Sequence, residues 1–297
     1  MPQIARRSEP DVIRLGYVKY LNTLPLVEGL GACRDVSLHA AVPSHLIDML
    51  EADEIDIGLV SLIDAARSRT ELALLPVGMI GCDGPTLTVR LFSSTPIDRI
   101  RVVHADADSH TSTCLVSVLL HAMHGVRVTV VPFDARERMP LGPEGRLNGE
   151  GESATAEAPE ATLLIGDKVV TDAPSSEKYP YQLDLGEAWK RLTGLPFVYA
   201  VWMCTRERAH EERVRLAAAL LERQRLHNST RLDWIVSTRA AERAWPDDLA
   251  RVYVGSLLRY EVDDAARESA ERFLAMSAQL GLCPAPPTGG ASLNWAR

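Results

Sequence analysis

The sequence predicts an α/β protein of two lobes with a ligand-binding cleft between them. Strand-like and helix-like segments alternate through the first half of the 297-residue chain, a pattern typical of sheets with right-handed helical crossovers. A second α/β block begins near Ile100, and the last third of the chain has the apolar spacing of helices. We therefore expect two largely parallel sheets, with the C-terminal helices packed on the first.

Five strands and two helices are predicted in the first block. The strands are expected at 12–18, 36–42, 55–60, 72–80 and 87–92, and the helices at 24–30 and 43–51. Pro25 opens the first helix, at a position where the backbone N–H has no partner within the helix. In the second helix Leu46, Ile47 and Leu50 share one face, which indicates that this face is buried.

The second block and the C-terminal third follow the same logic. Strands are expected at 100–104, 126–132, 161–165 and 196–204, and helices at 111–123, 187–192, 207–227, 240–254 and 263–280. Residues 136–159 are rich in Gly, Pro, Glu and Ala and have no periodicity. This composition predicts a mobile surface insertion.

The order of these blocks predicts how the lobes share the chain. Residues 12–91 and 202–297 are assigned to lobe 1, and residues 92–201 to lobe 2. The chain then crosses between lobes twice, near Arg90–Phe92 and near Ala200–Cys204. Two crossings permit a hinge, and the cleft at such a boundary is the expected site for a small molecule.

Composition excludes several classes of partner. The formal net charge is −8 without any basic block, which argues against nucleic acid and anionic membrane surfaces. No segment approaches the ~20 apolar residues that span a bilayer, and the polar start of the chain has no signal-peptide core. The five cysteines form no close pair, as expected for reduced thiols in a cytoplasm. We therefore expect a cytoplasmic protein with a small-molecule ligand.

Two strand-to-helix junctions carry small hydroxyl and amide side chains. The first is 20–25, with Asn22, and the second is 108–113, with Ser109 and Thr111. Free N–H groups and the positive end of the helix dipole make such a junction suitable for an anion. One junction in each lobe would hold two carboxylates of one ligand. Ordinary capping of the two helices is the alternative interpretation.

Three further segments are candidates for the cleft. Thr86 and Thr88 are expected on the same side of a strand, although such hydroxyls are equally common on an edge strand. Asp167 follows a strand, where ligands of open α/β sheets usually bind, and is alternatively the N-cap of the next helix. The aromatic side chains of 193–202 would cover a flat ring or fill the core, and Phe197 is assigned to the core.

Motifs for other chemistries are missing. His121 and His124 share a helix face without a third ligand nearby, which favours a plain surface. The chain has no glycine-rich phosphate loop, no G-x-S-x-G elbow and no H-E-x-x-H. We therefore expect no metal and no organic cofactor. We also expect a reaction that depends little on acidic and basic side chains of the protein.

Six short strings between about Ile13 and Ala275 carry a family resemblance. They are Tyr20–Leu21–Asn22 with Pro25–Leu26, Gly58–Leu59–Val60–Ser61, Leu91–Phe92–Ser93, Asp108–Ser109–His110–Thr111–Ser112, Leu164–Ile165–Gly166–Asp167 and Thr193–Gly194–Leu195–Pro196–Phe197–Val198. In this order they resemble the chorismate dehydratase (MqnA-type) family of the futalosine route to menaquinone.

The resemblance implies a fold, a reaction and a set of site residues. The fold would be similar to type II periplasmic binding proteins, and chorismate would lose water to give 3-[(1-carboxyvinyl)oxy]benzoate. The enolpyruvyl carboxylate of the substrate would take the proton, so the protein mainly fixes geometry and assists the leaving hydroxyl, which Asn22 would contact. The substrate-binding residues would be Tyr20, Ser61, Thr86, Thr88, Ser109, Thr111, Ser112 and Asp167.

The sequence departs from this family at a few positions. His110 stands where Arg is usual, Cys82 and Thr88 stand where Ser is common, and the 136–159 insertion is longer. Dihydroxynaphthoate synthase of the same pathway is an alternative, but its N-terminal Cys-Pro-Asn-Asp signature is missing here. A non-enzymatic binding protein for a small carboxylate is the other alternative, against which the lack of an export signal weighs.

Overall fold

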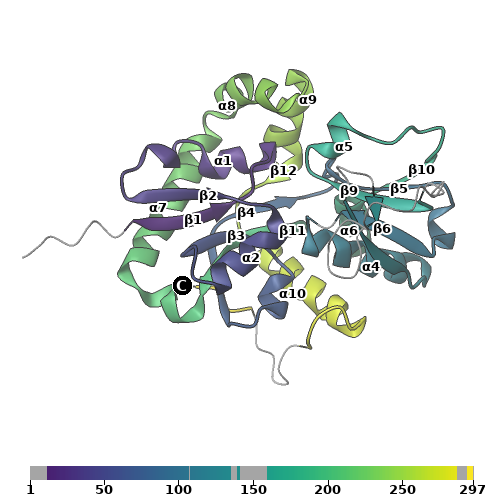
Figure 1. Ribbon diagram of the computed structural model, residues 1–297, viewed down its shortest axis with the longest axis horizontal. Coiled ribbons are helices and arrows are strands. Elements are labelled where there is room, and N and C mark those ends of the chain that lie inside the picture. The colour runs from purple at the N-terminus through teal and green to yellow at the C-terminus, as the bar shows by residue number, and fades with distance from the viewer. Residues whose placement is uncertain (1–11, 107, 135–138, 141–158, 286–292, 297) are drawn as a thin grey trace, which may run out of the picture.

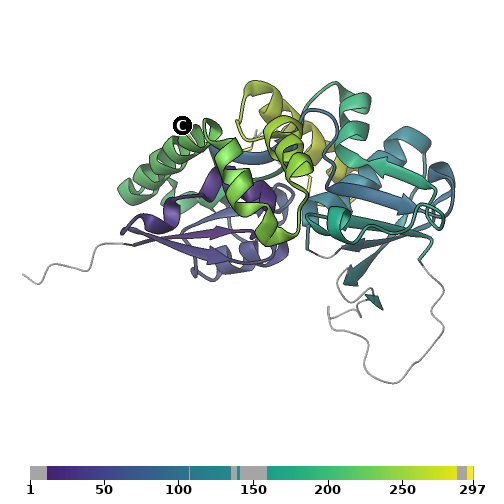
Figure 2. The same ribbon diagram turned by 90° about the horizontal axis from the view of Figure 1, so that it is seen from above.

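A computed structural model describes residues 12–106, 108–134, 139–140, 159–285 and 293–296, which form two six-stranded sheets lying beside each other (Figures 1 and 2). Each sheet carries helices on its faces, and a sheet with its helices is called a lobe below. The predicted insertion 136–159 lies almost entirely outside the described residues. In the part of the chain described, no helix is long and apolar enough to cross a membrane.

The first sheet has the strand order β12-β4-β11-β3-β1-β2. Its strands are β1 (Ile13–Tyr17), β2 (Val36–Ala40), β3 (Ile57–Ser61), β4 (Leu72–Cys82), β11 (Phe197–Thr205) and β12 (Leu258–Arg259). β1 pairs in parallel with both β2 and β3. All five residues of β3 are buried, because this apolar strand lies inside the sheet and is covered on both faces.

The second sheet has the order β10-β5-β9-β6-β7-β8. Its strands are β5 (Val89–Ser93), β6 (Val102–Asp106), β7 (Thr129–Asp134), β8 (Met139–Pro140), β9 (Ala161–Ile165) and β10 (Tyr181–Asp184). β6 pairs in parallel with β7 and β9. β9 has the bounds that the sequence predicts, whereas β8 and β10 were not predicted.

Both sheets are mixed, so the expectation of largely parallel sheets is wrong. β11 runs antiparallel to β3 and β4, and β5 runs antiparallel to β9 and β10. β5 and β11 are the strands by which the chain enters each sheet from the other lobe. A strand that enters from the far side of the molecule runs against its neighbours, and a βαβ pattern does not reveal this direction.

The crossings lie several residues from the positions expected. β4 of the first sheet ends at Cys82 and β5 of the second begins at Val89, so the first crossing is 83–88. The second crossing is the short segment 194–196, between α6 (Leu185–Thr193) and β11. Residues 90–92 and 200–204 are instead paired within sheets.

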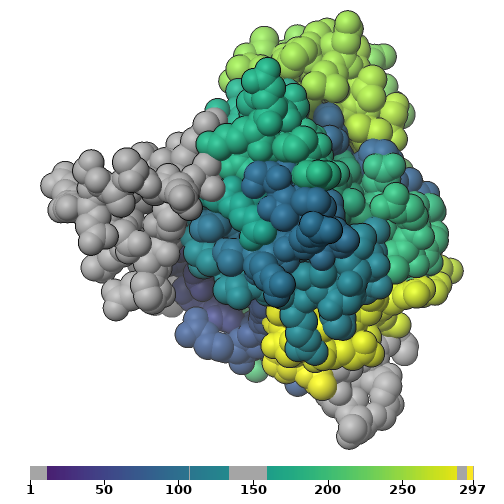
Figure 3. Space-filling model, turned by 90° about the vertical axis from the view of Figure 1, so that its right-hand side faces the viewer, coloured from purple at the N-terminus to yellow at the C-terminus, as the bar shows by residue number. Residues whose placement is uncertain are grey.

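The helices cover the faces of the sheets, and one C-terminal helix, α10 (Asp264–Gln279), contacts both lobes. The remaining α-helices are α1 (Leu24–Val27), α2 (Pro43–Glu51), α3 (Asp64–Arg67), α4 (His110–His124), α5 (Lys168–Thr171), α7 (Glu212–Ser229), α8 (Leu232–Arg239) and α9 (Asp247–Val252). α2 has the bounds predicted from sequence. α7 packs on β4 and α1, as expected, whereas α10 contacts both β11 and α4. Figure 3 shows the α8–α9 region (yellow-green) beside the teal surface of the second lobe.

The single helix predicted at 240–254 is wrong. The chain forms α8, then a turn, then α9 and a π-helix at Tyr253–Leu257. Ala244 adopts a left-handed conformation with φ of 57°. Pro246 has no N–H to donate and disfavours helical backbone in the residue before it, which separates the two helices.

An aromatic cluster joins the lobes behind the cleft. Trp189 on α6, Phe197 on β11 and Phe273 on α10 meet edge to face, with ring centroids 5.1 to 6.1 Å apart. The Trp189 indole donates to Ser269 Oγ over 3.0 Å. The assignment of Phe197 to the core is therefore confirmed, and the second crossing is anchored against the helices of both lobes.

Candidate ligand-binding cleft

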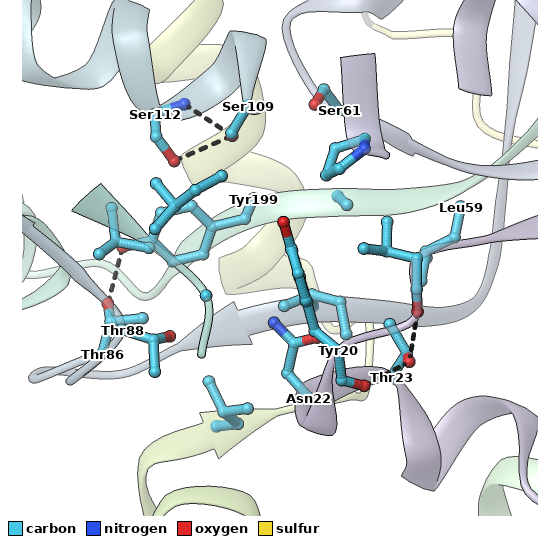
Figure 4. A pocket seen from close by; sticks show the side chains of 18 of the residues that line it. Tyr20, Asn22, Thr23, Leu59, Ser61, Thr86, Thr88, Ser109, Ser112 and Tyr199 are labelled. Carbon is cyan, nitrogen blue, oxygen red and sulfur yellow. Dashed lines mark hydrogen bonds between the residues drawn. The ribbon is translucent and has the colours of Figure 1, made fainter. Parts of the chain in front are cut away.

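A cleft between the lobes brings together most of the predicted site residues (Figure 4). Seven of the nine line it, namely Tyr20, Asn22, Ser61, Thr86, Thr88, Ser109 and Ser112. The empty space between these residues, about 580 Å³, includes open solvent at the mouth of the cleft. Figure 4 shows Asn22 and Tyr20 pointing into the space between the crossing threonines and the α4 serines.

The first junction presents Asn22 to the cleft. β1 ends at Tyr17, and Asn22 lies in a 3₁₀ turn, Leu21–Thr23, that leads into α1. Neither this turn nor α1 has a side-chain cap, so the capping interpretation of Asn22 is wrong. The Asn22 Oδ1 atom is buried without a hydrogen-bond partner among the described residues. The Oδ1 atom is therefore held at the cleft without a hydrogen bond to the surrounding fold.

The second junction presents hydroxyls at the start of α4. Ser109 is the N-cap, and its Oγ accepts from the Ser112 N–H over 3.2 Å, as the capping interpretation expects. The Ser109 hydroxyl in turn donates to Ser112 Oγ over 3.0 Å. Both side chains also line the cleft. The positive end of a 15-residue helix thus faces the cleft together with two hydroxyls.

Thr111 does not reach the cleft. It is fully buried, and its Oγ1 accepts a hydrogen bond of 3.2 Å from the backbone N–H of Ile63 in the first lobe. The neighbouring His110 is directed the same way, with Nδ1 2.9 Å from Asp64 Oδ1. These two side chains therefore tie α4 to the first lobe.

Thr86 and Thr88 both reach the cleft, but not from a strand. β5 begins after them, and Leu87 between them has φ of 70°, a left-handed conformation rare for a branched residue. The Asp184 carboxylate holds this turn by accepting from Thr86 N–H over 2.9 Å and from Leu87 N–H over 2.7 Å. The reversal at Leu87, rather than strand alternation, sets the direction of both hydroxyls.

Two tyrosines complete this wall, and the sequence analysis considered only the first of them, Tyr199, as one of the aromatic side chains of 193–202. The Tyr199 hydroxyl lies 2.7 Å from Thr86 Oγ1, and the Tyr253 hydroxyl lies 2.6 Å from Thr88 Oγ1. Tyr199 was part of the predicted aromatic strand, whereas Tyr253 lay inside a predicted helix without any motif. No local signal pointed to Tyr253, because it reaches the cleft only through the π-helix near the end of the chain.

Asp167 does not line the cleft. Burial raises the pKa of its carboxyl, and the Trp245 indole and the Leu21 N–H of the first lobe lower that pKa in part. Asp167 occupies the N-cap position of α5, as the alternative expects, although its side chain makes no cap hydrogen bond. The adjacent Gly166 lines the cleft instead, with φ of 67°, and a Cβ there would lie 3.1 Å from the Tyr20 ring.

A polar bridge closes one side of the cleft. The Tyr20 hydroxyl donates to Asp108 Oδ2 over 3.0 Å, and Lys168 Nζ donates to the same oxygen over 3.0 Å. Lys168 also pairs with Asp106. Burial raises the pKa of Asp106, and the Lys168 charge lowers it in part.

The lining is neutral and rich in hydrogen-bond donors. Lys, Arg and His do not occur among the cleft-lining residues of the described chain. Carboxylate oxygens can accept hydrogen bonds there from the hydroxyls, the one carboxamide and the N–H groups at the start of α4. Such hydrogen bonds to an anion are stronger than those between neutral groups. The arrangement suits an acidic small molecule whose reacting atoms need orientation.

Comparison of whole structures defines the class of protein. The fold is similar to the periplasmic aliphatic sulphonate binding protein SsuA from Escherichia coli, with a TM-score of 0.60 and 15% identity over 96% of both chains. It is also similar to a Candida albicans gene product with the generic periplasmic binding protein fold, with a TM-score of 0.62 and 12% identity over 90% of both chains. The fold is therefore periplasmic-binding-protein-like, as predicted.

Comparison of sequences defines the family. A family model described as menaquinone biosynthesis matches residues 13–279. A relative, the chorismate dehydratase from Thermus thermophilus, is 29% identical over 208 residues, which are 65% of this chain and 70% of the relative. The chain belongs to the menaquinone biosynthesis family, which confirms the resemblance found in the six sequence strings.

Proposed function

We propose that this protein is a chorismate dehydratase, a carbon–oxygen lyase that converts chorismate to 3-[(1-carboxyvinyl)oxy]benzoate and water in menaquinone biosynthesis. The observation that carries the proposal is a neutral, donor-rich cleft containing Asn22, in a chain of this family. The similarity to the Thermus thermophilus chorismate dehydratase supports the same reaction.

The chemistry suits a cleft without an acid–base pair. The proton at the ether-bearing ring carbon is allylic and vinylogous to the ring carboxylate, so its loss gives a delocalised anion. The enolpyruvyl carboxylate of the substrate takes this proton, and departure of the neighbouring hydroxyl makes the ring aromatic. The protein holds the reactive conformer and assists the departing oxygen.

The lining residues divide this work between the two lobes. Ser109, Ser112 and the α4 N-terminus bind one substrate carboxylate. Asn22 donates to the departing hydroxyl from the first lobe, and a neutral amide suits this place because a carboxylate would repel a dianionic substrate. Thr86, Thr88 and Ser61 line the remaining walls.

A cytoplasmic location is part of this proposal. All five cysteines, Cys33, Cys82, Cys114, Cys204 and Cys283, are unpaired, which fits a reducing compartment.

Incubation of the purified protein with chorismate tests the function. We expect loss of chorismate and appearance of an aromatic product with the mass of the substrate less one water, identified by mass spectrometry and NMR. Heat-inactivated protein controls for spontaneous rearrangement of chorismate. Tight binding of chorismate without turnover would favour the binding-protein alternative, which the similarity to SsuA supports.

A further inference from the structure

We propose that Tyr253 is a positioning residue that orients the Thr88 hydroxyl and the Asn22 amide as hydrogen-bond donors to the substrate. This inference rests on the proposed function and adds a residue from the C-terminal segment to the site. The juxtaposition that carries it is the buried Tyr253 hydroxyl, 2.6 Å from Thr88 Oγ1 and beside the Asn22 amide.

The Tyr253 side chain is held rigidly. It is 1% exposed, and its ring stacks on the Trp245 indole with centroids 4.8 Å apart and an interplanar angle of 13°. It begins the π-helix, whose wider turn is closed by the Leu258 N–H donating to the Tyr253 carbonyl. Single π-turns recur at functional sites because they redirect one side chain within a helix.

Counting donors and acceptors settles the direction of the hydrogen bonds. Burial raises the pKa of Tyr253, and its hydrogen-bonding contacts with Thr88 and Asn22 lower that pKa in part. The Asn22 Oδ1 atom is without a partner in the described chain, so we assign the contact of Asn22 with Tyr253 to Nδ2, which can only donate.

The phenol proton is then directed to Thr88. Tyr253 is buried, and leaving its O–H unpaired would cost free energy, so it donates to Thr88 Oγ1. Thr88 accepts there and keeps its own proton. No other hydroxyl partner of Thr88 occurs among the residues described by the structure, so this proton is available to a ligand oxygen in the cleft.

The relay therefore runs from the Asn22 amide through Tyr253 to Thr88. The second Asn22 amide proton and the Thr88 hydroxyl proton both remain for acceptor oxygens of the ligand. Tyr253 comes from the C-terminal segment of the first lobe, and Thr88 lies on the crossing to the second. The relay thus depends on the arrangement of the two lobes seen here.

A double-mutant cycle with Tyr253→Phe and Thr88→Val tests the relay. We expect Tyr253→Phe to lower kcat/KM about tenfold, the scale of one lost hydrogen bond. Because most of this loss passes through Thr88, the double variant should be little worse than Thr88→Val alone. Tyr260→Phe is the matched control, since the buried Tyr260 hydroxyl has no hydrogen-bond partner among the described residues, and it should behave as wild type.

A second readout does not depend on turnover. In ¹⁵N-labelled protein, Tyr253→Phe should shift the side-chain amide signals of Asn22, and Tyr260→Phe should leave them in place. Unchanged Asn22 signals, wild-type kcat/KM in Tyr253→Phe, or fully additive losses in the double variant would each overturn the relay. An inactive wild-type protein would overturn the proposed function, while the amide signals would still decide the position of Tyr253.

Discussion

The Tyr20 hydroxyl donates to Asp108 Oδ2 over 3.0 Å, and this hydrogen bond joins the two lobes beside the cleft that Tyr20 lines. The backbone continues the connection, because the Ser44 N–H of α2 donates to the Asp108 carbonyl over 3.0 Å. The start of α4 is thus held against the first lobe beside the cleft. A ligand that stabilises this arrangement would be enclosed and shielded from water.

Tyr20→Phe is expected to loosen closure of the cleft. It removes one hydrogen bond to a charged group, worth roughly 1.5 kcal/mol at the low end of the usual range, and KM should rise about tenfold. X-ray scattering should show a larger radius of gyration without ligand, and less compaction with a chorismate analogue. Tyr181→Phe, at an exposed tyrosine of β10, is the control. If Tyr20→Phe kept the KM and the scattering profile of wild type, this hydrogen bond would not contribute to closure of the cleft.

Much of this arrangement could be predicted from sequence, because local patterns carry it. The apolar run of β3 and the apolar face of α2 are local patterns that predict buried elements. The small polar side chains at the two junctions predict the position of Asn22, Ser109 and Ser112 at the cleft. A strand end followed by a helix with Pro or Ser at its start is a local signal.

The remainder depends on contacts between distant residues. Leu87 adopts a left-handed conformation only because Asp184, far along the chain, holds its N–H. Thr111 faces Ile63 rather than the cleft because the first lobe offers an unpaired N–H there. Tyr253 reaches the cleft through a π-helix, which the spacing of apolar residues does not predict. Such features follow from tertiary packing, which one sequence does not display.

Ser112→Ala is expected to weaken binding more than chemistry. The Ser112 hydroxyl lines the cleft and accepts a hydrogen bond from the Ser109 hydroxyl, so its own O–H can donate to a carboxylate. Its loss should raise KM by about tenfold or more with little change in kcat, the pattern for binding shared by ground and transition states. Thr113→Ala, whose hydroxyl donates to the His110 carbonyl within α4, should leave KM unchanged. A steep fall in kcat with constant KM would make this junction catalytic.

The fold should lose stability in acid through Asp56. Burial alone would raise the pKa of Asp56, but Arg14, through hydrogen bonds and charge, and Arg213, through charge, hold it below its usual value. The unfolded chain therefore binds this proton more readily, so the stabilisation is present above about pH 4 and is lost as pH falls further.

Urea unfolding of Asp56→Asn between pH 3 and pH 7 measures this contribution. At pH 7 the variant should be less stable by roughly 3 kcal/mol, because the arginines lose their buried partner. The difference from wild type should shrink toward pH 3. Asp35→Asn, at an exposed position, is the control. A difference that stays constant with pH would show that protonation of Asp56 is not its source.

Chelation is expected to leave turnover intact. The proposed reaction uses the substrate's own carboxylate as base, and the sequence has no motif for a metal or nucleotide cofactor. Dialysis against EDTA should therefore not change kcat. Loss of activity that zinc or iron restores would contradict this prediction.

Asn22→Asp is expected to be the most damaging conservative change in the cleft. The side chain keeps its size, and because Asn22 caps no helix in the structure, the local fold does not require an amide. The change replaces a hydrogen-bond donor by a negative charge, which faces a dianionic substrate and a departing oxygen that needs a hydrogen-bond donor. Turnover should fall by a factor of about 100 or more, the scale for removing one preorganised donor.

Asn228→Asp provides the contrast. Asn228 is buried away from the cleft, and its amide donates to the Glu28 carbonyl over 3.0 Å, so this change should lower the melting temperature without lowering kcat of the folded enzyme. Asn22→Ala covers the case in which a buried carboxylate at position 22 prevents folding, since it removes the donor without adding charge. Circular dichroism and melting temperature identify the folded variants, and kcat is measured on those. Near-normal turnover in folded Asn22→Asp or Asn22→Ala protein would show that the leaving hydroxyl departs without help from Asn22.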